Sequence, residues 1–111
     1  MSLWNQINTA DNSNEATANE KHLPALSVEK VGDNRHRIEV NVGGGKHPNE
    51  PEHWIQWVEL RVNGLYIGRA EFSAVIMEPV AEFTVNGASG QKINAVARCN
   101  KHGLWQTDIS C

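Results

Sequence analysis

Alternation of polar and apolar residues is the feature that most restricts the fold of this 111-residue chain. In Arg35–Val42, His36 and the three apolar residues occupy every second position, and all the residues between them are polar or charged. This period of two is typical of a β-strand with one buried face. Segments 55–62 and 92–99 repeat the pattern, and no segment shows a sustained helical stripe. The predicted fold class is therefore all-β.

Turn-forming residues separate these strands. Asn63-Gly64 follows 55–62 directly, and Asn-Gly between two extended runs is the strongest short-range hairpin signal because both residues tolerate positive φ. The turn-rich segment 86–90 is predicted to join strands 80–85 and 92–99 as a second antiparallel pair. Further strands are expected from about Leu26, at 65–72 and at 105–109. Such closely spaced strands predict an antiparallel sandwich of two sheets.

Length and charge restrict the domain organisation and the partners. A mass of 12.3 kDa is that of one domain, and residues 1–19, which are poor in large apolar groups, are predicted to form a flexible N-terminal tail before a single domain at 20–111. The formal charge of −3 argues against nucleic-acid binding. The longest apolar run, 74–77, is too short to cross a membrane. Residues 1–19 contain no secretory signal, so we expect a cytoplasmic location.

Histidine is the unusual residue of the composition, with five copies beside two cysteines. Four histidines avoid the predicted strand interiors and lie in turn-prone segments: His22, His47, His53 and His102. Cys99 precedes His102 by two intervening residues, so both side chains can reach one metal ion from a single tight turn. Imidazole and thiolate together suit iron, copper, zinc or nickel, whereas magnesium and calcium prefer oxygen. These five side chains are the candidate ligands of one metal centre.

Simpler interpretations apply to some of the same residue types. His36 lies on the apolar face of its strand and is interpreted as a core or edge histidine outside the site. Cys99 taken alone would more often be a buried thiol, and a disulfide between Cys99 and Cys111 would remove the thiolate from the site. Glycines 43–45 do not indicate a phosphate-binding loop, because no helix follows them.

Three short motifs resemble those of superoxide reductases of the neelaredoxin type, which are related to the catalytic domain of desulfoferrodoxin. The motifs are Glu20-Lys21-His22-Leu23-Pro24, then His47-Pro48 with Glu52-His53-Trp54-Ile55, and Cys99-Asn100-Lys101-His102-Gly103-Leu104-Trp105. With the strand-rich stretches between them they span roughly residues 20–107. Any one motif could arise by chance, but three in register are a specific signal.

The resemblance implies an immunoglobulin-like antiparallel β-sandwich of about seven strands that reduces superoxide to hydrogen peroxide at a mononuclear non-haem iron centre. It implies four equatorial imidazoles and one axial thiolate, which by position are His22, His47, His53, His102 and Cys99. By the same resemblance, Glu20 can occupy the sixth position of ferric iron and Lys21 lies beside the open face. Two cysteines cannot build the four-cysteine second iron site of the family, so one iron per chain is expected.

The resemblance also implies partners. The electron donor is expected to be rubredoxin or a similar small carrier, and the protein is expected to be a homo-oligomer, either a tetramer or a dimer. Two residues depart from the family pattern: Asn49 stands where an apolar residue is common, and Cys111 has no assigned role.

Two other functions are open to a chain with these residues. A copper electron-transfer protein can also be a β-sandwich with a cysteine and histidines near its C-terminus, but it normally adds an axial methionine soon after the last histidine, and the only methionines here are Met1 and Met77. A binding module with a structural zinc site would use one cysteine and three histidines and leave one of the four histidines unused.

Overall fold

The computed structural model of the chain describes residues 7–8, 23–43 and 48–111. No α-helix occurs in these ranges, and strands account for most of them, which confirms the predicted all-β class. The strands are β1 (Ile7–Asn8), β2 (Pro24–Gly32), β3 (Arg35–Val42), β4 (Ile55–Val62), β5 (Leu65–Glu71), β6 (Val80–Asn86), β7 (Lys92–Cys99) and β8 (Gly103–Ser110). The described ranges also contain no helix that is long and apolar enough to span a membrane.

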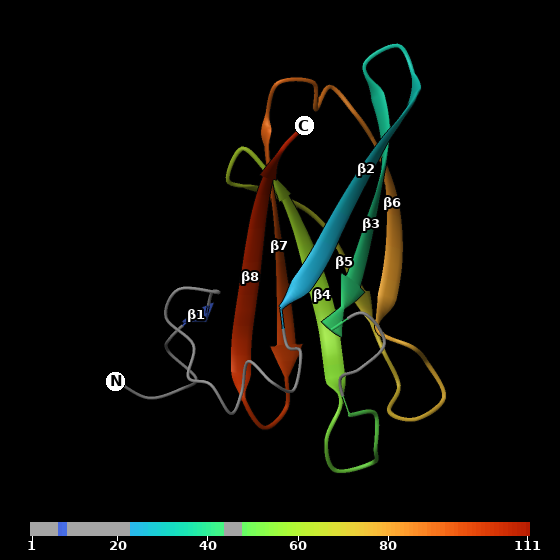
Figure 1. Cartoon of the computed structure of the whole chain (residues 1–111), viewed down its shortest axis with the longest axis vertical. Helices are drawn as coiled ribbons and strands as arrows, with labels where there is room; N and C mark the ends of the chain where they lie inside the picture. The colour runs from blue at the N-terminus through green and yellow to red at the C-terminus, as the bar shows by residue number, and fades with distance from the viewer. Residues whose placement is uncertain (1–6, 9–22, 44–47) are drawn as a thin grey trace.

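The strands form two sheets that pack face to face as the predicted sandwich (Figure 1). One sheet has the order β1-β8-β7-β4-β5, and the other has the order β2-β3-β6. Neighbouring strands are antiparallel except that β1 pairs in parallel with β8. β1 lies within the segment predicted as a tail, and the rest of residues 1–19 lies outside the described residues, so the tail and the domain boundary at residue 20 stay predictions.

The predicted pairing of 80–85 with 92–99 is wrong. β6 pairs with β3 in the smaller sheet, and β7 lies between β4 and β8 in the larger one. The connection 87–91 therefore crosses from one sheet to the other, and its Ala88 is only 1% exposed within the core. An alternating pattern shows that a strand has one buried face, but two such strands can either share a sheet or face each other across the interior.

The hairpin predicted at Asn63-Gly64 is confirmed. These residues join β4 to β5 and have φ angles of 50° and 83°, in the left-handed region that asparagine and glycine tolerate. The ladder begins after the turn at the pair Val62 with Leu65, and its register shifts at an irregularity between Leu60 and Arg61.

The core lies between the two sheets and is built from the alternating residues that the sequence singled out. From β3, Ile38, Val40 and Val42 are fully buried, and they are covered by residues of β4 and β7 such as Leu60 and Ile93. Each such side chain contributes roughly 1.5–3 kcal/mol when it is removed from water. On the same face of β3, His36 is 7% exposed, which agrees with its interpretation as a core histidine.

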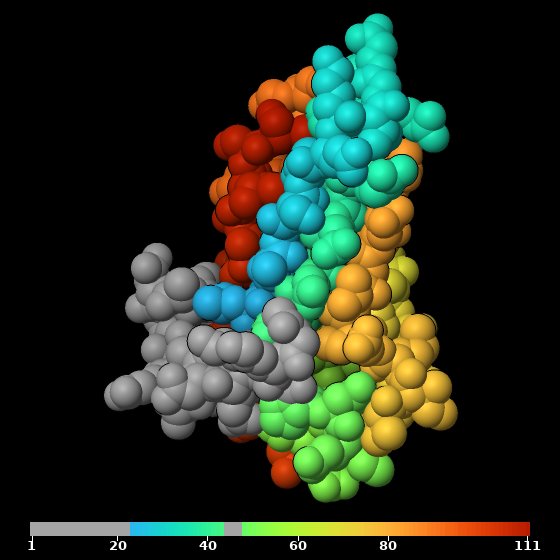
Figure 2. All heavy atoms as spheres, turned by 45° about the vertical axis from the view of Figure 1, so that its right-hand side comes forward, coloured from blue at the N-terminus to red at the C-terminus, as the bar shows by residue number. Residues whose placement is uncertain are grey.

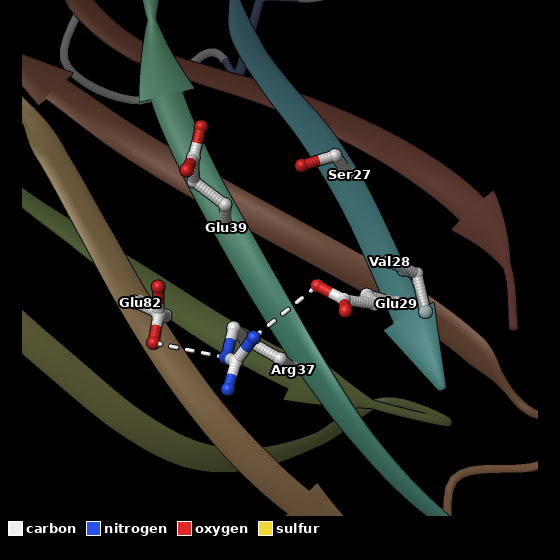
Figure 3. Close-up of a pocket in the computed structure, with 6 residues that line it drawn as sticks. All are labelled: Ser27, Val28, Glu29, Arg37, Glu39 and Glu82. Carbon is white, nitrogen blue, oxygen red and sulfur yellow. Dashed lines mark hydrogen bonds and ion pairs between the residues drawn. The ribbon is translucent and has the colours of Figure 1, made fainter. Parts of the chain in front are cut away.

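The outer faces of the sheets are polar. On β3, the Arg37 guanidinium pairs with Glu29 of β2 and with Glu82 of β6, each at 3.2 Å, across a shallow hollow (Figure 3). These side chains are largely exposed, so each ion pair contributes at most about 1 kcal/mol. The face in Figure 3 is thus a solvated outer surface of the smaller sheet.

The two ends of the sandwich differ in what they carry. At one end β4 begins, β7 ends and β8 begins, so loop 48–54 and turn 100–102 lie together; we call this the site end (Figure 1). At the other end lie the β2–β3 turn 33–34, the connection 87–91 and the C-terminal Cys111; we call this the far end (Figure 1).

Candidate metal centre

Antiparallel pairing of β4 with β7 brings together two segments that are far apart in the sequence. Ile55 at the start of β4 is the ladder partner of Cys99 at the end of β7. His53 precedes that pair by two residues on one strand, and His102 follows it by three residues in the turn to β8. The ladder therefore delivers all three side chains to the site end.

The donor atoms of these three side chains lie close enough to bind one ion. One nitrogen of each histidine and the Cys99 sulfur all lie within 4.8 Å of one another, the one such group of three or more among the described residues. The distance from Cys99 Sγ to His102 Nδ1 is 3.8 Å, and the two imidazole rings meet edge to face with centroids 5.1 Å apart. Bonds of about 2.0–2.3 Å to a metal place its ligand atoms roughly 3–4.5 Å apart, so this arrangement fits an ion.

Burial makes the site suitable for a thiolate ligand. Cys99 is fully buried, His53 is 9% exposed and His102 is half-buried, so the three side chains are largely withdrawn from solvent. A buried thiolate needs a nearby positive charge, which a metal ion supplies. The alternative disulfide does not form, because neither Cys99 nor Cys111 is in a disulfide.

Four of the predicted site residues lie outside the described residues: Glu20, Lys21, His22 and His47. The strand ends next to two of them are described. Pro24 at the start of β2 pairs with Val42 at the end of β3, and the backbone N–H of Gly43 donates to the Leu23 carbonyl at 3.3 Å. These strand ends lie on the same side of the molecule as the end of β7 (Figure 1).

Local hydrogen bonds hold the turn that carries His102. Gly103 has a φ of 79°, a left-handed conformation that glycine adopts at little cost, and it lets the chain reverse directly into β8. The fully buried Trp105 donates its indole N–H to the His102 carbonyl at 3.2 Å. The turn is therefore fixed from the core side.

Loop 48–54 is held on two sides. Glu50 and His53 exchange both of their backbone hydrogen bonds, at 2.9 and 3.0 Å, so the loop closes on itself just before β4. Asn100, which lies between Cys99 and His102 in the sequence, bonds to this loop through its backbone and its side chain. Sequence reasoning missed Asn100, and its place inside the Cys99–His102 motif was the available signal.

Asn49, noted in the sequence as a departure from the family pattern, fastens a second loop to the site end. Its side-chain oxygen accepts from the Val75 N–H at 2.6 Å, and its Nδ2 donates to the Met77 carbonyl at 3.0 Å. Val75 has a φ of 71°, which is strained for a β-branched residue and is held by these bonds. Figure 2 shows the two segments side by side on the surface.

Comparisons with known proteins agree with this geometry. A sequence model described as Desulfoferrodoxin matches residues 14–108. A superoxide reductase from Pyrococcus horikoshii is 38% identical over 102 residues, which are 81% of this chain and 86% of that protein.

Solved structures show the same likeness. A superoxide reductase from Nanoarchaeum equitans has a TM-score of 0.79 and 35% identity, and the match covers 96% of this chain and all of that one. A superoxide reductase (neelaredoxin) from Ignicoccus hospitalis has a TM-score of 0.79 and 32% identity, with 93% and 91% of the two chains covered. The resemblance inferred from the three motifs is thus confirmed, and the chain belongs to the desulfoferrodoxin family.

Proposed function

We propose that this protein is a superoxide reductase, an oxidoreductase that combines superoxide with one electron and two protons to give hydrogen peroxide. The observation that carries the proposal is the cluster of His53, Cys99 and His102, whose donor atoms meet within 4.8 Å in a chain of this family. A bound mononuclear iron ion would supply the electron and, with one coordination position left open, a place for a small anion.

The ligand set of the proposal is one thiolate and four imidazoles. Cys99 would provide the sulfur, and His53 and His102 two of the nitrogens, in agreement with their distances. We assign the other two nitrogens to His22 and His47 from their places in the family motifs. A soft thiolate with imidazoles selects a transition metal over magnesium or calcium.

Lys21 is proposed to attract superoxide. The chain has a formal charge of −3, so the field of the whole molecule repels an anion and a local cation is needed beside the open position. We expect Lys21→Ala to slow the second-order reaction with superoxide and to flatten its dependence on ionic strength, as measured by pulse radiolysis. An unchanged rate at low salt would remove this role.

Glu20 is proposed to bind the oxidised centre after turnover. We expect Glu20→Ala to leave the reduction of superoxide by the ferrous protein largely intact and to change the visible spectrum of the ferric protein. If the ferrous variant no longer reduced superoxide, the carboxylate would have a different role.

A direct test separates this function from the two alternatives. Purified protein is analysed for metal, its visible spectrum is recorded, and peroxide formation from superoxide is measured. Iron, a ferric thiolate absorption band and stoichiometric peroxide support the proposal, whereas an intense blue copper band or colourless zinc without activity contradicts it.

The Met77 sulfur accepts from the Ser73 N–H at 3.5 Å within its own exposed loop, which does not favour an axial copper ligand there.

The partners and the location are proposed from the family resemblance. Rubredoxin or a similar small carrier would return the oxidised centre to the ferrous state. A tetramer or a dimer is the proposed assembly, and the cytoplasm is the proposed location. Sedimentation of the purified protein and reduction kinetics with a purified rubredoxin test the first two.

A further inference from the structure

We propose that Asn100 is a positioning residue that fixes His53 relative to Cys99 and His102. The inference rests on the proposed metal centre and deepens it, because it names the group that sets the distance between the two halves of the cluster. Asn100 follows Cys99 directly and precedes His102 by two residues. A displacement of Asn100 would therefore also displace these two donors.

All three hydrogen bonds of Asn100 that tie it to loop 48–54 end on the two residues that flank His53. Its backbone N–H donates to the Trp54 carbonyl at 3.2 Å, and its side-chain oxygen accepts from the Trp54 N–H at 3.0 Å. Its Nδ2 donates to the Glu52 carbonyl at 2.9 Å. The backbone of His53 is therefore bracketed on both sides by contacts to one residue.

The position of Asn100 explains why a side chain is needed for this purpose. The regular ladder between β4 and β7 ends at the pair Ile55–Cys99, because the chain must then turn to bring His102 back. Beyond that pair one backbone hydrogen bond, from the Asn100 N–H to the Trp54 carbonyl, continues the pairing before the chain turns toward His102. The Asn100 side chain adds bonds to the Trp54 N–H and the Glu52 carbonyl, and so pairs backbone groups that a further strand residue would otherwise pair.

Asparagine is the residue type that fits both contacts. The side chain must accept one hydrogen bond and donate another, and a carboxylate has no donor while an alanine has neither group. In contrast to a ligand, Asn100 has no role in holding the ion itself. Removing a partner that orients metal ligands typically lowers metal affinity or activity 10–100-fold, because small displacements of the ligands matter.

Asn94, in the strand β7 that leads to Asn100, provides a matched control. It is also half-buried, and its Nδ2 donates to Gln106 Oε1 at 3.1 Å and to Asp108 Oδ1 at 2.6 Å. These contacts lie within the ladder of β7 and β8, on the outer face of the sheet and away from the site end. Asn94→Ala therefore removes an asparagine of similar burial and bonding without touching loop 48–54.

The experiment compares Asn100→Ala, Asn100→Asp and Asn94→Ala in the full chain. Metal-free protein is titrated with Co²⁺ against a competing chelator, the cobalt–thiolate absorption is recorded, and thermal unfolding of the metal-free protein is measured. We expect Asn100→Ala to weaken Co²⁺ binding about 10–100-fold and to shift the thiolate band. Asn94→Ala should lower the unfolding temperature by a similar amount and leave Co²⁺ affinity within about twofold.

Asn100→Asp keeps the acceptor for the Trp54 N–H and removes the donor to the Glu52 carbonyl, so its Co²⁺ affinity should lie between those of the wild type and Asn100→Ala. It replaces the alanine variant in the test if that variant does not fold. Co²⁺ affinity and a thiolate band equal to those of the wild type in a folded Asn100 variant would overturn the inference. A wild-type protein that binds Co²⁺ through Cys99 but has no superoxide reductase activity with iron would instead contradict the proposed function alone.

Discussion

Asparagine side chains join two segments at each end of the sandwich, but among the described residues a group of three potential metal donors lies only at the site end. At the site end, Asn100 joins turn 100–102 to loop 48–54 around His53. At the far end, the Asn34 side-chain oxygen accepts from the Ser89 N–H at 3.1 Å and joins the β2–β3 turn to the connection 87–91. At both ends, asparagine side-chain hydrogen bonds thus hold two non-strand segments together.

The two ends differ in the side chains that lie next to these hydrogen bonds. At the site end the bonds of Asn100 flank a buried imidazole beside a buried sulfur. At the far end the bonds of Asn34 and the backbone pairing of Cys111 with Gln91 and Gly90 hold segments that are mostly exposed to solvent. A substitution at the far end should therefore change stability alone, whereas one at the site end should change metal binding as well.

The two cysteines give the largest expected difference between the ends. Cys99→Ser should abolish the thiolate-to-iron absorption band and lower superoxide reduction by more than about 100-fold, because a direct ligand matters more than the groups that orient it. Cys111→Ser, at the far end, should keep both the band and the activity. Visible spectra and stopped-flow or pulse-radiolysis rates of the iron-loaded variants measure this. A band that persists in Cys99→Ser would show that Cys99 is not the ligand.

Trp105→Phe tests whether packing at the site end also positions the metal ligands. The fully buried indole donates to the His102 carbonyl, and phenylalanine loses this hydrogen bond and part of the ring volume. We expect a loss of about 1–3 kcal/mol in the free energy of unfolding, measured with urea on the metal-free protein. Metal affinity should fall in the same variant. A purely stabilising role would leave the affinity at its wild-type value.

The sequence predicted most of the strands. Of the metal centre it predicted the residue types of the ligands but not the contacts that position them. The bounds of β3, β4 and β7 agree with the alternating segments, because each strand buries one face and exposes the other. The partner of β6 could not be predicted, since alternation does not say which of two sheets a strand joins. For the same reason the crossing of 87–91 between the sheets was missed.

At the site, the motifs pointed to residue types and not to the contacts that hold them. His53 and Cys99 were assigned to one centre from their residue types and the family resemblance, but the β4–β7 register that brings them together could not be predicted, because alternation leaves it undetermined. Asn100 was overlooked, and the contacts of Asn49 were not predicted, because asparagine is common in turns and gives no periodic signal. Their function depends on carbonyl and N–H groups brought close by the fold, which the sequence does not display.

Glu59 lies between the two ends, on the outer face of the larger sheet. A substitution there tests whether a loss of stability in the sheet alone changes metal affinity. Burial raises the pKa of its carboxyl, but hydrogen bonds and charges from Arg69 and Arg61 outweigh burial and hold the pKa below its ordinary value of 4.5. A lowered pKa in the folded protein stabilises it above pH 4.5, and this stabilisation is lost as the pH falls through the folded value.

We therefore expect Glu59→Gln to cost about 1 kcal/mol of unfolding free energy at pH 7, because both arginines are more than a third exposed and solvent screens the pairs. The difference from the wild type should shrink below pH 4.5. Urea unfolding of the metal-free proteins at several pH values measures it. A difference that is constant with pH would contradict the ion-pair interpretation, and Co²⁺ affinity should stay unchanged throughout.

Asn34→Gly is expected to have no larger an effect than Glu59→Gln, and it gives the strictest test of the contrast between the ends. Glycine accepts the φ of 51° at this position, so the variant removes the bond to Ser89 without backbone strain. We expect a loss of about 1 kcal/mol, seen as a fall of roughly 4–8 °C in the unfolding temperature of the metal-free protein. Co²⁺ affinity should stay within about twofold of the wild type. Asn34 leads directly into β3, whose other end lies toward the site end. A loss of Co²⁺ affinity as large as in Asn100→Ala would therefore contradict the contrast. It would mean that β3 transmits displacements between the two ends and that the bond from Asn34 to Ser89 helps to position the metal ligands.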